Sequence, residues 1–140
     1  MTAPGFVDTT ILVYALADTG DERPARARAL IETLLDEQNA AVSIQVLKEV
    51  YAVATLKLKE PPARREAISI IKDLLDACRV VDDTLPQLDR PLHLASTRKL
   101  SIWDASVIAA AEAAGCRELY TEDLTHGATI GSVQIKNPLR

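Results

Sequence analysis

Four acidic residues stand in apolar stretches of the chain, where an ionised side chain is costly. Asp8 directly follows the apolar run 5–7, and Asp123 closes the segment LYTED. Glu49 and Asp104 have apolar residues three and four positions away, a spacing that places them on one face of a helix. Both are therefore expected to project from the buried side of their helices. Carboxylates are rarely buried unless they are paired or hold a metal.

The chemistry that four converging carboxylates would perform follows from their charge. Their mutual repulsion must be relieved by a proton or a divalent cation. Oxygen ligands without His or Cys favour Mg²⁺ or Mn²⁺ over zinc, and such ions promote attack of water on phosphodiesters. No Ser–His–Asp arrangement competes. The only histidines, His93 and His126, lie in a proline-flanked segment and a polar turn, and we interpret both as surface residues.

Each acid also has a purely structural interpretation. Asp8 can cap the helix that follows it, and Asp104 fits the third position of a capping box that begins at Ser101. Glu49 can reach solvent from the flank of its helix, and Asp123 can be a turn residue. Each of these explanations is the simpler one for a single acid. If all four structural explanations held, the four acids would lie at one edge of the fold only by coincidence. We therefore favour a shared site.

The secondary-structure elements that position these acids are predicted to be short strands that alternate with longer helices. Five short apolar runs predict strands, at 5–7, 40–44, 79–81, 118–121 and 132–136. Longer segments predict helices, or helical turns around two prolines in the case of 84–100, at 9–17, 22–38, 45–58, 63–78, 84–100 and 101–115. This order predicts an α/β three-layer sandwich, with a short central parallel sheet of about five strands and helices on both faces. Functional groups in such sheets gather at the carboxyl ends of the strands.

Composition narrows the class of protein. The 140 residues suit a single domain, 1–140, and an aromatic content of 4% predicts an aliphatic core. The net charge of −4 offers no overall attraction to nucleic acid or anionic lipid, although a local patch can still bind one. Cys78 and Cys116 lack pairing or metal spacing and are interpreted as reduced core residues. No signal peptide or membrane-length apolar run is recognisable, so we expect a cytoplasmic protein without membrane contact.

The acids, in this order, resemble those of PIN-domain ribonucleases, and within that family the VapC-like toxins of bacterial type II toxin–antitoxin pairs. The resemblance spans nearly the whole chain. It rests on FVDTTILVYALA with Asp8, SIQVLKEVYAV with Glu49, LSIWDASVIAAAEAAGCRELYTEDLTHG with Asp104 and Asp123, and the closing segment VQIKNP. It implies a PIN-like fold and Mg²⁺- or Mn²⁺-dependent endonucleolytic cleavage of RNA. The four acids would hold the metal, and one of them would help to deprotonate the attacking water.

Two hydroxyl residues belong to the same resemblance. The opening motif of the family usually reads Asp-Thr-Asn or Asp-Thr-Ser, and here it reads Asp-Thr-Thr, which keeps a hydroxyl at Thr10. Thr121 matches a small hydroxyl residue often found near the metal site. Glu122 adjoins Asp123, but the motif favours Asp123 as the fourth acid.

The resemblance also implies partners: RNA as substrate, a cognate antitoxin protein, and a second copy of the chain in a homodimer. The apolar stretches 11–17 and 46–58 could receive an antitoxin segment, although core packing explains most of their residues. The sequence leaves open which basic side chains contact RNA; the candidates are Arg23, Arg26, Arg28, Lys57, Lys59, Arg64, Arg65, Arg98 and Lys99.

Two other function classes remain as alternatives. A receiver-type signalling domain also gathers acids at strand ends, but it needs an adjacent acidic pair after the first strand, where Asp8 stands alone. Asp82 and Asp83 do follow the run 79–81, yet that interpretation leaves Glu49 and Asp104 unexplained. A catalytically silent PIN-like binding module is the second alternative, and such a module has no need of all four acids.

Overall fold

Strands and helices alternate along residues 3–140, the part of the chain that the computed structural model describes. The strands are β1 (Gly5–Val7), β2 (Ala40–Ser43), β3 (Arg79–Val81), β4 (Glu118–Tyr120), β5 (Thr129–Ile130) and β6 (Val133–Lys136). The helices are α1 (Thr9–Leu16), α2 (Arg23–Asp36), α3 (Ile44–Leu56), α4 (Arg64–Ala77), α5 (Pro86–Arg98) and α6 (Ile102–Ala113).

The strands form one sheet in the order β3-β2-β1-β4-β6-β5. Neighbouring strands are parallel except for β5 and β6, which form an antiparallel hairpin. The predicted α/β sandwich is therefore confirmed, with one strand more than expected. The sequence did not reveal β5 because this strand is only two residues long, too short for any alternating pattern. It is defined by its pairing with β6 across a turn in which Gly131 adopts a positive φ of 59°.

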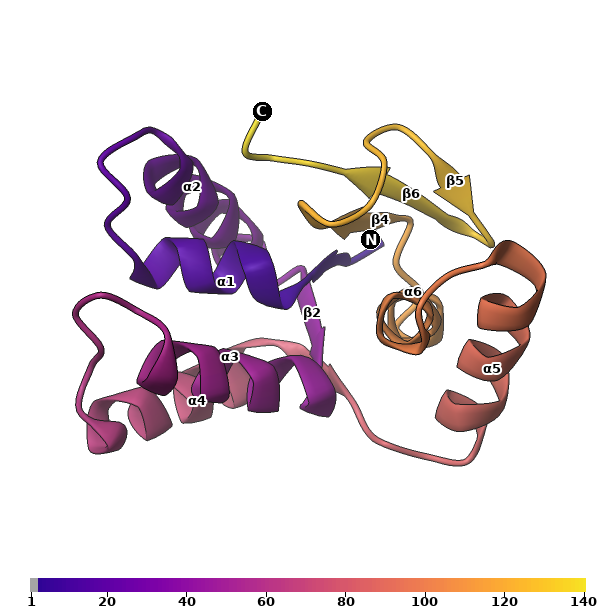
Figure 1. Cartoon of the computed structure of the whole chain (residues 1–140), viewed down its shortest axis with the longest axis horizontal. Helices are drawn as coiled ribbons and strands as arrows, with labels where there is room; N and C mark the ends of the chain where they lie inside the picture. Colours follow the sequence, from indigo (N-terminus) through magenta and orange to yellow (C-terminus); the bar gives the residue numbers. More distant parts are fainter. Residues whose placement is uncertain (1–2) are drawn as a thin grey trace.

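The strand order explains why helices cover both faces of the sheet. The chain moves from β1 to β2 to β3 in one direction, and then returns from β3 to β4 in the other. Since crossover connections are right-handed, the first two connections place α1 to α4 on one face and the third places α5 and α6 on the opposite face. Figure 1 shows this arrangement, with α6 against the sheet and α5 outside it.

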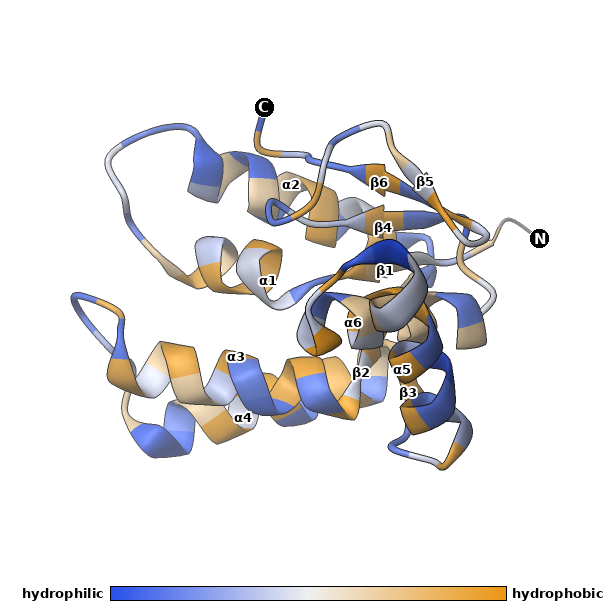
Figure 2. Ribbon diagram, turned by 45° about the vertical axis from the view of Figure 1, so that its right-hand side comes forward, coloured by the Kyte–Doolittle hydropathy of each residue, from blue (hydrophilic) through white to orange (hydrophobic). Residues whose placement is uncertain are grey.

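The core is aliphatic, as the composition predicts. Phe6, Ile11, Ile108, Leu119 and Ile135 are fully buried, and they come from both helical layers and the sheet. Helix α6 is buried along most of its length, whereas α3 and α4 carry both hydrophobic and hydrophilic residues (Figure 2). None of the helices within residues 3–140 is long and apolar enough to cross a membrane.

The segment 84–100 forms a more regular element than expected. It is a continuous helix, α5, rather than isolated turns around two prolines. Pro86 occupies the first helical position, where the absence of an N–H group costs nothing. Pro91 lies inside the helix and removes one backbone hydrogen bond, but its ring is fully buried against the core.

Candidate active site

The site lies where the strand order changes direction. Strand β1 has β2 on one side and β4 on the other; the helices α1 and α2 that follow β1 lie on one face, and the helices α5 and α6 that precede β4 lie on the opposite face. A crevice forms at such a point, outside the carboxyl ends of the strands. Asp8 directly follows β1, and its N–H donates to the carbonyl of Tyr120, the last residue of β4, at 3.0 Å. The predicted position of Asp8 at the carboxyl edge of the sheet is thus observed.

The same strand order excludes the receiver-type alternative. Receiver-like sheets place the first strand between the second and the third, in the order 2-1-3-4-5. In this chain β1 lies between β2 and β4. The acidic pair Asp82 and Asp83 follows β3 at the outer edge of the sheet, away from the strand that carries Asp8.

Asp8 is the most buried of the four predicted acids, with 6% of its surface exposed. Its Oδ1 accepts a hydrogen bond from the Thr9 N–H at 2.7 Å, which caps α1. Its Oδ2 accepts one from the Thr121 hydroxyl at 2.8 Å, and Thr121 Oγ1 in turn accepts the N–H of Asp123 at 3.1 Å. Thr121 has no exposed surface. The buried hydroxyl therefore ties the segment after β4 to the acid after β1.

Glu49 lies in the second turn of α3 and is half-buried, facing α1. One carboxylate oxygen accepts the Thr9 hydroxyl at 2.9 Å, and the other accepts the Gln45 side-chain amide at 3.1 Å. These two bonds fix the Glu49 side chain between the helices. Neither partner was singled out from the sequence. Gln45 could have been found from the sequence, because it stands four residues before Glu49 and the two side chains therefore share a face of the helix.

Asp104 and Asp123 occupy the outer part of the site. Asp104 is half-buried in the first turn of α6, and its N–H donates to the Ser101 hydroxyl at 3.1 Å. Asp123 is exposed in the turn after β4. The predicted caps at Asp8 and Ser101 are both confirmed; the Ser101 cap uses only the backbone N–H of Asp104, whereas the Asp8 cap uses one of its carboxylate oxygens. Glu49 and Asp104 lie at the edge of the core rather than deep inside it, because each stands near the end of its helix that meets the crevice.

Electrostatic interactions connect the four acids. The pKa of Asp8 is raised to about 6, mainly by burial and to a smaller extent by the charges of Asp123 and Glu49, against the lowering effect of the bonds from Thr121 and Thr9. The pKa of Asp123 is also raised, by partial desolvation first and then by Asp104, Glu122 and Glu49. Mutual repulsion of this kind is the property that a bound cation would relieve.

The four acids do not lie within common ligating distance of one point. Within residues 3–140, no three Asp, Glu, His or Cys side chains lie close enough to ligate one cation as they stand. The donor set nevertheless fits a hard divalent cation, since it consists of carboxylate oxygens at one sheet edge. Thr10, in the first turn of α1, has a hydroxyl oxygen that is buried and has no hydrogen-bond partner among these residues. Such a group is costly to leave unpaired and is suited to an external polar partner.

The remaining candidate side chains lie at the surface. His93 is exposed on α5, and His126 is exposed in a loop, where its Nδ1 accepts the N–H of Asn137 at 2.9 Å. Both agree with their interpretation as surface residues. Arg23, one of the basic candidates, pairs with Asp21 at 2.7 Å and donates to the Tyr14 hydroxyl at 2.8 Å.

Several solved structures share this fold over most of the chain. A chain of a toxin–antitoxin complex from Klebsiella pneumoniae superposes with a TM-score of 0.70 and 20% identity, covering 98% of each chain. VapC20 of Mycobacterium tuberculosis, described as a toxin that cleaves the sarcin-ricin loop, gives a TM-score of 0.66 and 20% identity over 85% of this chain and 91% of that one. A DNA-bound VapBC structure from Salmonella typhimurium gives 0.69 and 15% identity, covering 98% of this chain and 99% of that one.

Sequence comparison supplies the family. No curated protein sequence matches the chain significantly. The family model of the PIN domain matches residues 5–127, which include all four acids and every element from β1 to β4. That range covers most of the 140 residues, and the strand order and the acids at the carboxyl edge agree with it. The chain belongs to the PIN-domain family.

Proposed function

We propose that this protein is a metal-dependent endoribonuclease and the toxin of a toxin–antitoxin pair. The observation that supports this most strongly is the placement of Asp8. It is buried at the switch point of the sheet, its pKa is raised, and charge interactions link it to Glu49 and Asp123. Asp123 is linked in the same way to Asp104. Clusters of acids with perturbed pKa values in a crevice are typical of active sites.

In this proposal Asp8, Glu49, Asp104 and Asp123 are both the metal ligands and the catalytic residues. Mg²⁺ or Mn²⁺ bound there would neutralise the carboxylates and polarise the scissile phosphate. Thr121 holds the Asp8 carboxylate in place. The Thr10 hydroxyl lies in the first turn of α1, the helix that Asp8 caps.

One carboxylate must accept the proton of the attacking water. Asp123 is suited to this role because it is exposed to solvent and its pKa is raised toward the range in which a carboxylate is an effective base. Asp8, by contrast, has both oxygens engaged by Thr9 and Thr121 and is held rigidly. We therefore assign Asp8 to ligation and Asp123 to proton transfer as well as ligation.

Partners follow from the structural neighbours. The Klebsiella and Salmonella structures are of complexes between toxin and antitoxin, or of VapBC bound to DNA. We propose that this chain likewise binds a cognate antitoxin protein, forms a homodimer, and acts on RNA in the cytoplasm without membrane contact. A catalytically silent binding module remains the alternative, and a cleavage assay separates the two.

The test is cleavage of pooled RNA by the purified wild-type chain in Mg²⁺, in Mn²⁺ and in EDTA. Internal cleavage is expected with either cation and not with EDTA, because four unneutralised carboxylates would repel the phosphate. The products are followed on a sequencing gel with end-labelled RNA. Cleavage that continues unchanged in EDTA contradicts metal dependence. No cleavage under any condition favours the silent module.

A further inference from the structure

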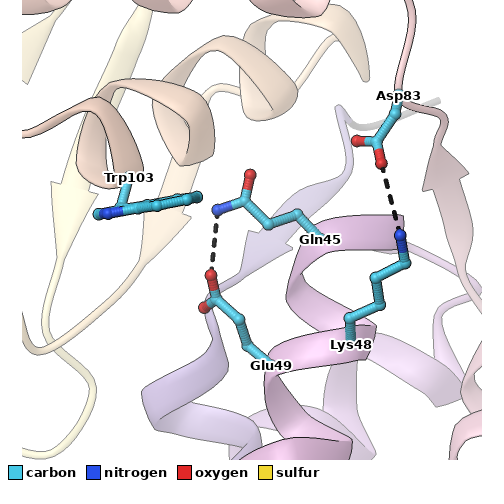
Figure 3. Close-up of a pocket in the computed structure, with 5 residues that line it drawn as sticks. All are labelled: Gln45, Lys48, Glu49, Asp83 and Trp103. Atoms are coloured by element: carbon cyan, nitrogen blue, oxygen red, sulfur yellow. Dashed lines mark hydrogen bonds and ion pairs between the residues drawn. The ribbon is translucent and has the colours of Figure 1, made fainter.

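An open pocket of about 660 Å³ adjoins the proposed active site (Figure 3). Its volume lies within the range of about 300–1,000 Å³ that is common for small-molecule sites. It is lined by Glu49, by Gln45, which donates a hydrogen bond to Glu49, and by three residues that have no role so far: Lys48, Asp83 and Trp103. Three of the five come from α3, Trp103 comes from α6 and Asp83 from the segment after β3.

Trp103 is the only tryptophan of the chain, and 65% of its surface is exposed. Because most of its surface is exposed and the core is built from other residues, Trp103 contributes little to the fold. It immediately precedes Asp104 in the first turn of α6, and its ring stands beside the pocket opposite Gln45 (Figure 3). A large, exposed aromatic ring beside a carboxylate site offers an apolar face to a ligand that also carries a charge.

Lys48 is the one cation among the residues that line this pocket. Its ammonium lies 4.0 Å from Asp83, and both side chains are mostly exposed, at 75% and 65%. An exposed ion pair of this length is weak, so Lys48 can exchange Asp83 for another anion. The other charged residue of the lining, Glu49, belongs to the proposed metal site, where a cation would neutralise it. The pocket thus combines a flat apolar face with a cation that can bind phosphate.

We propose that Trp103 stacks on an unpaired nucleobase next to the scissile phosphate, and that Lys48 contacts the phosphate of that nucleotide. This inference rests on the proposed ribonuclease activity and adds two residues that position the RNA beside the acids: Trp103 for the base and Lys48 for its phosphate. Stacking on an aromatic side chain requires a base outside the double helix and tolerates any base, since each has a π face. Trp103 is a positioning residue in this account.

The fluorescence of Trp103 tests the contact without catalysis. Because the chain has no other tryptophan, its emission reports on this side chain alone. A short single-stranded oligoribonucleotide is added with Mg²⁺ to the Asp123→Asn variant, in which the cation neutralises the remaining acids but the proton acceptor for cleavage is absent, and it is expected to quench the emission in a saturable way. Duplex RNA of the same sequence is expected to quench it much less. Equal quenching by both, or none by either, overturns the proposal.

Kinetics provide the second readout. Trp103→Ala is expected to raise KM for single-stranded RNA by between about 5-fold and 150-fold, the range that loss of one base stack produces, while kcat stays nearly unchanged. Trp103→Phe retains an aromatic face and should restore most of the KM. Leu56→Ala is the matched control, since Leu56 is also a large exposed apolar residue, at 75%, and does not line the pocket.

The outcomes separate this inference from the proposed function. A wild-type chain that cleaves RNA, beside a Trp103→Ala chain with an unchanged KM, overturns the stacking role and leaves the nuclease intact. A Trp103→Ala chain that cleaves normally but escapes inhibition by its antitoxin assigns Trp103 to the protein partner and also overturns it. A wild-type chain that cleaves no RNA overturns the proposed function itself, and the fluorescence titration then decides the stacking contact independently.

Discussion

Asn in place of Asp8 is expected to lower kcat for RNA cleavage by at least about 100-fold, the usual effect of removing one preorganised electrostatic group from an active site. Asn retains the acceptor that caps α1, and Asn is among the best capping residues, so the helix should keep its first turn. The negative charge next to Glu49 and Asp123 is lost, and so is the acceptor of the Thr121 hydroxyl, since Asn has a single side-chain oxygen. The rate is measured on labelled single-stranded RNA at saturating Mn²⁺.

Asp104→Asn should cause a loss of similar size. The backbone N–H of Asp104, not its carboxylate, bonds to Ser101, so the cap of α6 survives the substitution. Asp89→Asn is the matched control, because Asp89 is an exposed acid in the first turn of α5 and undergoes the same chemical change. Undiminished cleavage by both Asp8→Asn and Asp104→Asn would remove these acids from the active site.

The second large effect is on stability in the absence of metal. The pKa of Asp8 is raised from 3.8 to about 6 in the folded chain, so the folded state binds the proton more tightly than the unfolded state. The free energy of unfolding should therefore fall as the pH rises from about 4 through about 6. The shift corresponds to about 3 kcal/mol at 1.36 kcal/mol per unit. Asp8→Asn removes this pH dependence, so the stability of the variant relative to the wild type should rise by about 3 kcal/mol between low pH and pH 8 in EDTA.

Urea unfolding at pH 8, 6 and 4 in EDTA measures this effect. The stability of Asp8→Asn relative to the wild type should be highest at pH 8 and should fall toward pH 4, where the wild-type carboxyl is protonated in the folded state and partly protonated in the unfolded state. Asp89→Asn should change stability little and by a similar amount at each pH, since Asp89 is exposed. A stability difference between Asp8→Asn and the wild type that is the same at pH 4 and at pH 8 would contradict a raised pKa of Asp8 and its place in a cluster of repelling acids.

The positions of Asp8 and Asp123 were predictable because each follows a strand, and the carboxyl ends of parallel strands meet at one edge. The helical spacing around Glu49 and Asp104 correctly indicated a face turned toward the core, but it did not reveal that both acids stop at its edge. That depends on where each helix begins relative to the sheet: Asp104 lies in the first turn of α6, and Glu49 in the second turn of α3. Periodicity gives a direction around the helix axis and not a depth.

The contacts between distant segments were not predictable. The Thr9 hydroxyl binds Glu49 across forty positions of sequence, while Thr10, the residue that the motif pointed to, has its hydroxyl buried without a partner among residues 3–140. Adjacent residues on a helix point in directions about 100° apart, so which threonine faces α3 depends on how the helices cross. The exposure of Trp103 was not predictable either, because an aromatic residue in an apolar helix is typical of a core.

Direct binding of Mn²⁺ tests the central claim, that the four acids form one metal site. Free Mn²⁺ is quantified by its electron paramagnetic resonance signal while metal-free protein is added. Saturable binding to the wild-type chain and to Asp89→Asn is expected. Asp8→Asn should lose most of that affinity, because one charged oxygen ligand is removed. A wild-type chain that leaves the free Mn²⁺ signal unchanged, or an Asp8→Asn chain that binds as well as the wild type, would contradict this claim.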